Sequence, residues 1–159
     1  MFLRALLAFI ALPGVVAFLA PLLILDISQP EPTFNVVGAP FLGAGLAALL
    51  WCVWAFYTTG KGTLAPWSPP RHLVTIGLYG FTRNPMYVAV LLVLVGWAVS
   101  FSSLALAEYA AIVAVAFHLR VLFGEEPWLA RMHGSAWQEY KESVPRWLGR
   151  RHIQSHARE

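Results

Sequence analysis

The amino-acid sequence predicts an all-α integral membrane protein, with four transmembrane helices and short amphipathic helices in a cytoplasmic C-terminal tail. Only 12% of its 159 residues are charged, about half of the roughly 25% usual in soluble domains. Hydrophobic residues make up 58% of the chain. Four apolar stretches approach the length of about 20 residues that crosses a bilayer. The length suits one membrane domain over 1–159 and excludes a separate soluble enzyme domain beside a multi-span body.

The predicted spans follow one another closely. In chain order they are 2–25, 34–57, 85–101 and 104–123. A signal peptide is the less favoured interpretation of the first span, because it is long for one and lacks a clear small-residue cleavage site. The third and fourth spans are separated only by the residues around 100–103, which predicts a tight antiparallel hairpin.

The basic residues predict the orientation. All eleven Lys and Arg fall on one side of a four-span arrangement, in the N-terminus, the loop 58–84, the inner edge of the fourth span and the tail 124–159. The loop between the first two spans carries Asp26 and Glu31 but no Lys or Arg. Because cytoplasmic loops carry an excess of Lys and Arg, both termini are expected in the cytoplasm.

The second span is rich in small residues. Ala39, Gly43 and Ala47 are spaced four apart, which lets another helix approach closely. We expect this stripe to pack within the bundle, and a dimer face is the less favoured alternative. Cys52 is the single cysteine, so a disulfide framework and a cysteine-based zinc site are excluded, no metal site is predicted, and Cys52 is expected to serve packing.

Other functional classes leave no signature. There is no G-x-G-x-x-G or G-x-x-x-x-G-K-[ST] motif for a nucleotide. The basic run 146–151 follows a transmembrane domain, and we expect it to contact lipid headgroups rather than nucleic acid. Glu108 lies one turn into the fourth span, close enough to the surface to reach water, so solvation is favoured there over a functional role.

A helix start is predicted at the mouth of the third span. Pro85 suits the first helical position, and Asn84 then becomes the N-cap. On the simplest interpretation this is a capped helix with Arg83 as an interfacial anchor. On the functional interpretation, the free N–H groups of the helix start face a polar ligand. Tyr87 follows Asn84 by three residues and lies on nearly the same face.

Two adjacent carboxylates, Glu125 and Glu126, follow the fourth span, and Pro127 is expected to start a new helix. Acidic residues stabilise a helix start, which is sufficient to explain them. However, His118 and Arg120 lie one to two turns upstream, where polar groups are expensive and tend to face a cavity or one another. Together these residues predict a polar pocket at the cytoplasmic boundary.

The tail is predicted to contain an amphipathic helix. The residues 135–138 fit a capping box at its start. Trp137, Tyr140 and Val144 then share one face. Such a helix lies on the membrane surface or folds back over the pocket.

Five features occur in a fixed order over about residues 60–147. They are Leu73-Val-Thr-Ile-Gly-Leu-Tyr79, Arg83-Asn-Pro-Met-Tyr87, Glu125-Glu-Pro-Trp-Leu129, Gly134 with Tyr140, and Val144-Pro-Arg146. In this order and spacing the chain resembles the integral-membrane methyltransferases of the isoprenylcysteine carboxyl methyltransferase family, including its bacterial members, and the related phospholipid methyltransferases. Asn84 stands where the prenylcysteine enzymes usually have a histidine, a departure that bears on the acceptor more than on the cofactor.

The resemblance implies S-adenosylmethionine as cofactor, bound at the cytoplasmic end of the bundle. The cofactor-binding residues it implies are His72, Leu73, Val74, Tyr79, Asn84, Pro85, Met86, Tyr87 and Glu126, with Glu125 as the alternate. The expected catalytic residues are Arg83, Arg120 and Glu125. Among these, Arg120 corresponds to an arginine that binds the substrate carboxylate in the eukaryotic enzymes, and either arginine is suited to an anionic acceptor group.

Methyl transfer from a sulfonium is an in-line displacement that needs no metal and no covalent intermediate, so the enzyme mainly aligns the reactants and excludes water. Tyr79 and Tyr87 are suited to stabilise the sulfonium by cation–π contact. The expected acceptor is a lipid-like or isoprenoid small molecule with a carboxylate, amine, thiol or phenol, entering from the bilayer. A bacterial inner membrane is the expected location, and a homo-oligomer is left open.

Two alternatives remain at this point. An NADPH-dependent membrane reductase has a similar C-terminal hairpin, but such chains are usually longer and have more spans. A non-enzymatic membrane protein, such as a small transporter or an assembly factor, is the other alternative. It predicts no pocket lined by Tyr87 and Glu126.

Overall fold

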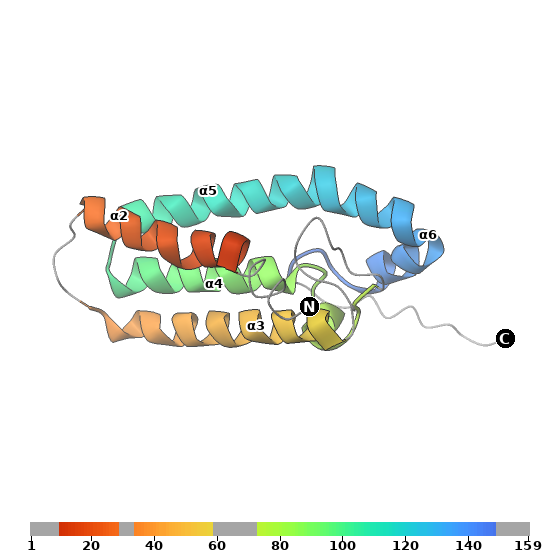
Figure 1. Ribbon diagram of the computed structural model, residues 1–159, viewed down its shortest axis with the longest axis horizontal. Helices are drawn as coiled ribbons and strands as arrows, with labels where there is room; N and C mark the ends of the chain where they lie inside the picture. Colours follow the sequence, from red (N-terminus) through yellow and green to blue (C-terminus); the bar gives the residue numbers. More distant parts are fainter. Residues whose placement is uncertain (1–9, 29–33, 59–72, 149–159) are drawn as a thin grey trace.

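The structure, a computed structural model, describes residues 10–28, 34–58 and 73–148. Within these ranges the chain is helical without any strand, which confirms the all-α class. The elements are η1 (Ile10–Leu19), α2 (Ala20–Ser28), η2 (Val36–Gly38), α3 (Ala39–Thr58), η3 (Gly77–Gly80), α4 (Pro85–Ser100), α5 (Leu104–Arg120), η4 (Val121–Glu125) and α6 (Glu126–Ser143). Figure 1 shows α2 to α5 lying along one another, with α6 continuing α5 and then folding back.

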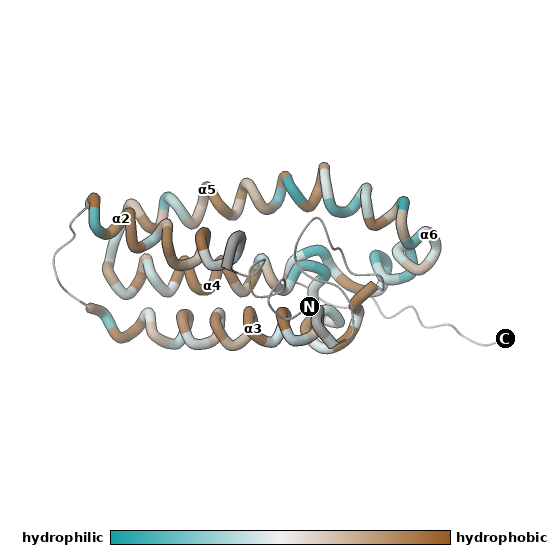
Figure 2. The backbone as a smooth tube through the Cα atoms, in the orientation of Figure 1, coloured by the Kyte–Doolittle hydropathy of each residue, from teal (hydrophilic) through white to brown (hydrophobic). Residues whose placement is uncertain are grey.

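The apolar character of the helices supports a membrane protein. Two helices of the described part, Val36–Ala55 and Leu104–Ser143, are long and apolar enough to cross a membrane, whereas Pro13–Ser28 and Pro85–Ser100 are apolar but shorter. Figure 2 shows hydrophobic residues along α2, α3 and α4, and hydrophilic residues gathered at the end where α6 folds back. The number of four spans therefore stays a prediction, and the beginning of the first one lies outside the described residues.

The tight hairpin predicted around 100–103 is present between α4 and α5. Ser102 reverses the chain with a φ of 47°, a conformation uncommon outside glycine. Ser103 is the N-cap of α5, and its Oγ accepts a hydrogen bond from the Leu106 amide at 3.4 Å. The hairpin fixes the end of α5 beside the start of α4, and these are the two places that carry the sequence motifs.

The stripe of small residues in α3 does not pack as predicted. Ala39, Gly43 and Ala47 are exposed on the outer face of α3. The close approach to α4 uses another face, where a Cβ on Gly45 would lie 2.8 Å from a backbone oxygen of α4. Gly96 of α4 is equally tight against α3. Residues two positions apart on a helix differ by about 200° in direction. Gly43 and Gly45 therefore point to nearly opposite sides of α3.

Proline leaves a carbonyl of the first helix without its usual partner, and neighbouring helices donate to this carbonyl and to the one before it. Pro21 has no N–H to offer Ala17, four residues earlier, and it lies just after the wide turns of η1. The Trp97 Nε1–H of α4 donates to the Ala17 oxygen at 3.0 Å, and the Tyr109 hydroxyl of α5 donates to the Val16 oxygen at 3.1 Å. Neighbouring helices thus supply the missing donor, as an apolar surrounding requires.

The helix predicted to start at Pro127 is present as α6, which begins at Glu126 and has Pro127 in its first turn. It is not set off from α5, because the backbone runs from α5 through η4 into α6 without a break. The wider turn of η4 is where the continuous helix accommodates a residue that lacks a backbone donor.

The break comes later, at Gly134, whose φ of 51° and ψ of −121° are non-helical. The second half of α6 then turns back. No capping-box hydrogen bond from 135–138 is among those of the described residues, so Gly134, rather than a cap, makes the turn. Trp137, Tyr140 and Val144 form a buried cluster against Leu73. This confirms the shared face and selects folding back over lying flat on a membrane.

Candidate functional site

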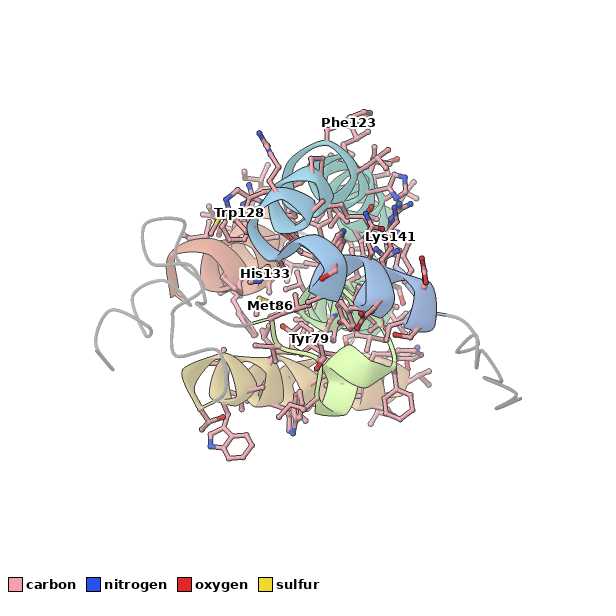
Figure 3. The ribbon with its side chains drawn as sticks, turned by 90° about the vertical axis from the view of Figure 1, so that its right-hand side faces the viewer. Tyr79, Met86, Phe123, Trp128, His133 and Lys141 are labelled. Atoms are coloured by element: carbon pink, nitrogen blue, oxygen red, sulfur yellow. The ribbon has the colours of Figure 1, made fainter. Side chains whose placement is uncertain are left out.

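The sequence motifs meet at one end of the helices. Three segments come together there: the residues 82–87 at the start of α4, the residues 117–126 from the end of α5 to the start of α6, and the residues 144–147 after α6, which we call the tail segment. The hairpin brings the first two together, and the reversal at Gly134 brings the third. Figure 3 views this end and shows α6 crossing it, with Trp128, His133 and Lys141 on α6.

The first cluster at this end contains Tyr87, Arg120 and Glu125. The Tyr87 hydroxyl donates to Oε1 of Glu125. Nε of Arg120 lies 3.1 Å from the Tyr87 hydroxyl oxygen and 3.0 Å from the same Glu125 oxygen. The Tyr87 ring packs on Phe117 with 4.4 Å between ring centroids. The side chains of Arg120 and Glu125 are 54% and 34% exposed, so this cluster opens to the surroundings.

The second cluster, Arg83, Glu126 and Arg146, is much more buried. Arg146 holds Glu126 with two hydrogen bonds, from Nε to Oε1 at 2.7 Å and from Nη2 to Oε2 at 2.9 Å. Nη1 of Arg83 lies 2.9 Å from Oε1 of the same carboxylate. The guanidinium of Arg83 stacks over the Trp137 ring at 5.4 Å. The side chains of Arg83 and Glu126 are only 7% and 11% exposed.

These contacts change the acidity of both partners. Burial acts to raise the pKa of Glu126, but the hydrogen bonds of Arg146 and the charges of Arg83, Arg146 and Lys141 outweigh it and hold the pKa below its usual value. Burial lowers the pKa of Arg83, against the charge of Glu126, and the charge of Arg146 lowers it further. Since the ordinary pKa of arginine is above 12, Arg83 stays charged at neutral pH.

The tail segment is tied to the start of α4 by its backbone. The Arg146 carbonyl accepts from Thr82 Oγ1 at 3.1 Å and from Asn84 Nδ2 at 2.9 Å. The Pro145 carbonyl accepts from the Arg83 amide at 2.9 Å. The Asn84 side chain makes no cap hydrogen bond to α4, contrary to the prediction, although Asn84 does occupy the N-cap position. Its amide group is engaged by a segment 62 residues away.

The apolar residues of the predicted site form its base. Val74 and Tyr79 are buried with Cys52, against which Met86 also packs. The Tyr140 hydroxyl donates to the Tyr79 carbonyl at 2.7 Å, which joins α6 to η3. Pro85 is buried as the first residue of α4, as predicted, Leu73 packs on the Trp137 cluster, and His72 lies outside the described residues.

The structure also places three further residues that the sequence singles out. His118 accepts a hydrogen bond from Trp147 Nε1 at 3.2 Å, so its partner is the tail segment. Glu108 is exposed on the outer face of α5, and its contact with water stays a prediction. Cys52 is fully buried.

Sequence reasoning missed the pairing of Arg146. It assigned Arg146 to lipid headgroups as part of the run 146–151, whereas the structure places its guanidinium on Glu126. The only sequence signal was the fixed position of Val144-Pro-Arg146 after the glutamates. Thr82 and Trp137 also contribute contacts that no local pattern indicates.

A comparison with known families identifies the type of protein. A family model for phospholipid methyltransferases matches residues 33–136, roughly two thirds of the chain. The chain belongs to the phospholipid methyltransferase family. Membership confirms the predicted relation to this group of membrane proteins and indicates a methyltransferase, in a family that generally uses S-adenosylmethionine. No curated protein and no solved structure matches the chain significantly.

The matched range includes both clusters except Arg146. Tyr87, Arg120 and the two glutamates lie inside it, whereas the tail segment follows it. The family match therefore does not cover Arg146, and the contacts of Arg146 are known only from the structure of this chain.

Proposed function

We propose that this phospholipid methyltransferase family member transfers a methyl group from S-adenosylmethionine to a lipid-like or isoprenoid small molecule at the cytoplasmic membrane interface. The acceptor group is a carboxylate, an amine, a thiol or a phenol. The observation that carries the proposal is that Tyr87 and Glu125, which come from two separate motifs inside the matched range, meet in one open cluster.

The residues of this cluster fit the cofactor. S-adenosylmethionine carries a sulfonium and an ammonium, both of which are cations. The contacts of Glu125 among the described residues all use Oε1, so Oε2 is free to accept a hydrogen bond from an ammonium or a ribose hydroxyl. The Tyr87 ring, held on Phe117, offers an aromatic face for the sulfonium.

The chain's own residues have distinct tasks in this proposal. When bound, the cofactor supplies an activated methyl group. Glu125 and Tyr87 bind the cofactor and fix its direction, and Arg120 holds both of them while its exposed guanidinium meets an anionic acceptor. The α6 helix folds back over this end and covers part of it. This division assigns Glu126 to the ion pairs with Arg83 and Arg146 rather than to direct cofactor contact.

The remaining sequence-predicted residues surround this end of the helices. They are His72, Leu73, Val74, Tyr79, Asn84, Pro85 and Met86, and their direct contact with the cofactor stays a prediction. The apolar ones form the base on which the clusters rest, and Asn84 ties down the tail segment. We assign these residues a structural role, which is to shape the site around the two clusters.

We further propose a single domain over 1–159 with four membrane spans, both termini in the cytoplasm, in a bacterial inner membrane. Support comes from the four apolar helical stretches and from the position of the charged clusters. Arg83, Arg120 and Arg146 all lie at the end opposite the α4–α5 turn. This is the arrangement that the excess of cytoplasmic Lys and Arg favours.

The test is calorimetric binding of S-adenosylhomocysteine to the full chain in detergent, with labelled methyl transfer to membrane lipid extracts. We expect binding by the native chain, weaker binding by Tyr87→Phe and Glu125→Gln, and no change in Glu139→Gln, which removes an exposed carboxylate of α6. The absence of both binding and transfer in the native chain contradicts the proposal. NADPH binding without S-adenosylhomocysteine binding would instead favour the reductase.

A further inference from the structure

The buried cluster has more positive than negative charge. Two guanidinium groups, those of Arg83 and Arg146, share the single carboxylate of Glu126. Lys141 adds a further positive charge that acts on this carboxylate. The neighbouring Glu125 already faces Arg120. A buried charge is costly unless it is paired. The cluster carries an excess of positive charge, which one further anion would balance.

Arg83 also has an unused donor. Its Nε is buried and lacks a hydrogen-bond partner within the described residues, whereas Nη1 lies 2.9 Å from Oε1 of Glu126 and is engaged by that carboxylate. The side chain is only 7% exposed, and its guanidinium is held over the Trp137 ring. A buried guanidinium that is held in place and has an N–H group left over is the kind of group that binds a carboxylate or a phosphate.

The start of α4 adds to the positive potential. Arg83 directly precedes Asn84, the N-cap of this helix of 16 residues, and the first turn receives no hydrogen bond from the Asn84 side chain. The positive end of the helix dipole therefore lies next to the two guanidinium groups. The helix dipole and the buried Nε of Arg83 together favour an anion at this position.

We propose that Arg83 and Arg146 form a binding site for one oxyanion, a carboxylate or a phosphate, with Glu126 as the counter-ion that holds the two guanidinium groups in position. The assignment of a source rests on the proposed function. One source is the α-carboxylate of the cofactor, and the other is the phosphate of a lipid acceptor. Both present the same chemistry to the arginines.

The experiment uses the full chain in lipid nanodiscs and the variants Arg146→Gln and Arg83→Gln, with Arg131→Gln as matched control. Arg131 is an exposed arginine of α6 whose Nε bonds the Pro127 carbonyl, outside both clusters. The cofactor arm compares S-adenosylhomocysteine with S-adenosyl-3-thiopropylamine, which keeps the amine and lacks the carboxylate. The lipid arm compares phosphatidic acid with diacylglycerol, which lacks the phosphate.

In the arm that supplies the oxyanion, we expect each cluster variant to lose tenfold or more in affinity for the probe with the carboxylate or phosphate. For the matched probe that lacks this group, the loss should be less than twofold. A loss confined to S-adenosylhomocysteine identifies the cofactor as the source. A loss confined to phosphatidic acid identifies the lipid. Arg131→Gln should change neither affinity by more than twofold.

Two results overturn the inference. One is equal affinities of the native chain and the cluster variants for all four probes. The other is an equal loss for the probes with and without the oxyanion, which indicates a structural role for the arginines. If the native chain binds no S-adenosylhomocysteine, the proposed function fails, but the lipid arm still decides the anion site. If Arg83→Gln does not fold, Arg146→Gln with its thermal unfolding curve decides.

Discussion

Two neighbouring carboxylates of this chain have opposite surroundings. Glu125 lies in an open cluster with Tyr87 and Arg120, where its side chain is 34% exposed and one oxygen takes all the contacts. Glu126, one residue on, has both oxygens bonded by Arg146 and faces Arg83, with 11% of its side chain exposed. One helical step of about 100° sends the two side chains to different partners.

The difference shows how a pair of glutamates can divide two tasks. A carboxylate whose oxygens are already paired in a buried site contributes to holding segments together, and its removal leaves buried cations behind. A carboxylate with a free oxygen in an open site contributes little to stability and is available to a ligand. The following predictions separate these tasks, beginning with the largest effect.

Removing Glu126 should have the largest effect on stability. Glu126→Ala leaves two guanidinium groups without their carboxylate, and we expect a loss of about 3 kcal/mol. Thermal or denaturant unfolding in detergent measures it. Glu139→Ala, at an exposed position on α6, should remain close to the native chain, and an equal loss in both variants would contradict the structural role of Glu126.

Replacing Glu125 should act on the ligand instead. In Glu125→Gln we expect affinity for S-adenosylhomocysteine to fall about tenfold, or ~1.4 kcal/mol. Its unfolding should change by less than about 1 kcal/mol, because the pair with Arg120 is exposed. Calorimetry and unfolding on one preparation compare the two effects. If the variant unfolds easily and still binds, the two glutamates have the reverse assignment.

Double-mutant cycles should rank the two ion pairs. For Arg120 with Glu125 we expect a coupling free energy of about 0.5 kcal/mol, and for Arg146 with Glu126 about 2 kcal/mol. The second pair is less exposed and doubly hydrogen-bonded. Unfolding free energies of the single and double alanine variants provide both values. Equal couplings would show that burial does not distinguish the pairs.

The smallest effect is a dependence on pH. The pKa of Glu126 is lower in the folded chain than its ordinary value of about 4.3, so its contribution to stability is complete above that value and is lost as the pH falls through the folded pKa. The stability difference between the native chain and Glu126→Gln should therefore be constant from about pH 5 to 7 and shrink below about pH 4. A difference that grows on acidification would show a raised pKa.

Much of this architecture was predictable, because span length and hydropathy depend on local composition. The helix start at Pro85 and the turn around 100–103 follow from the residues that form them. The meeting of the motifs at one end was also predictable, since a hairpin places the end of α5 beside the start of α4. The shared face of Trp137 and Tyr140 follows from helical spacing.

The partners across long sequence separations were not predictable. Asn84 has the residue type and position of a cap, yet its side chain makes no bond to the helix, and its Nδ2 instead donates to the Arg146 carbonyl. Gly43 and Gly45 are equally small, and only tertiary packing determines which of them faces α4. In the same way, nothing local distinguishes Glu125 from Glu126, because the distinction comes from the direction in which the tail segment returns.

The proline in the first helix has a consequence for assembly. Trp97 and Tyr109, which supply donors to the Ala17 and Val16 carbonyls, are 80 and 93 residues further along the chain. During synthesis the first helix is made long before these donors exist, and the Ala17 carbonyl, which Pro21 leaves without a donor, is costly in hydrocarbon until it is paired. The helix that is made first is therefore the one whose final position is fixed late, once the α4–α5 hairpin has formed beside it.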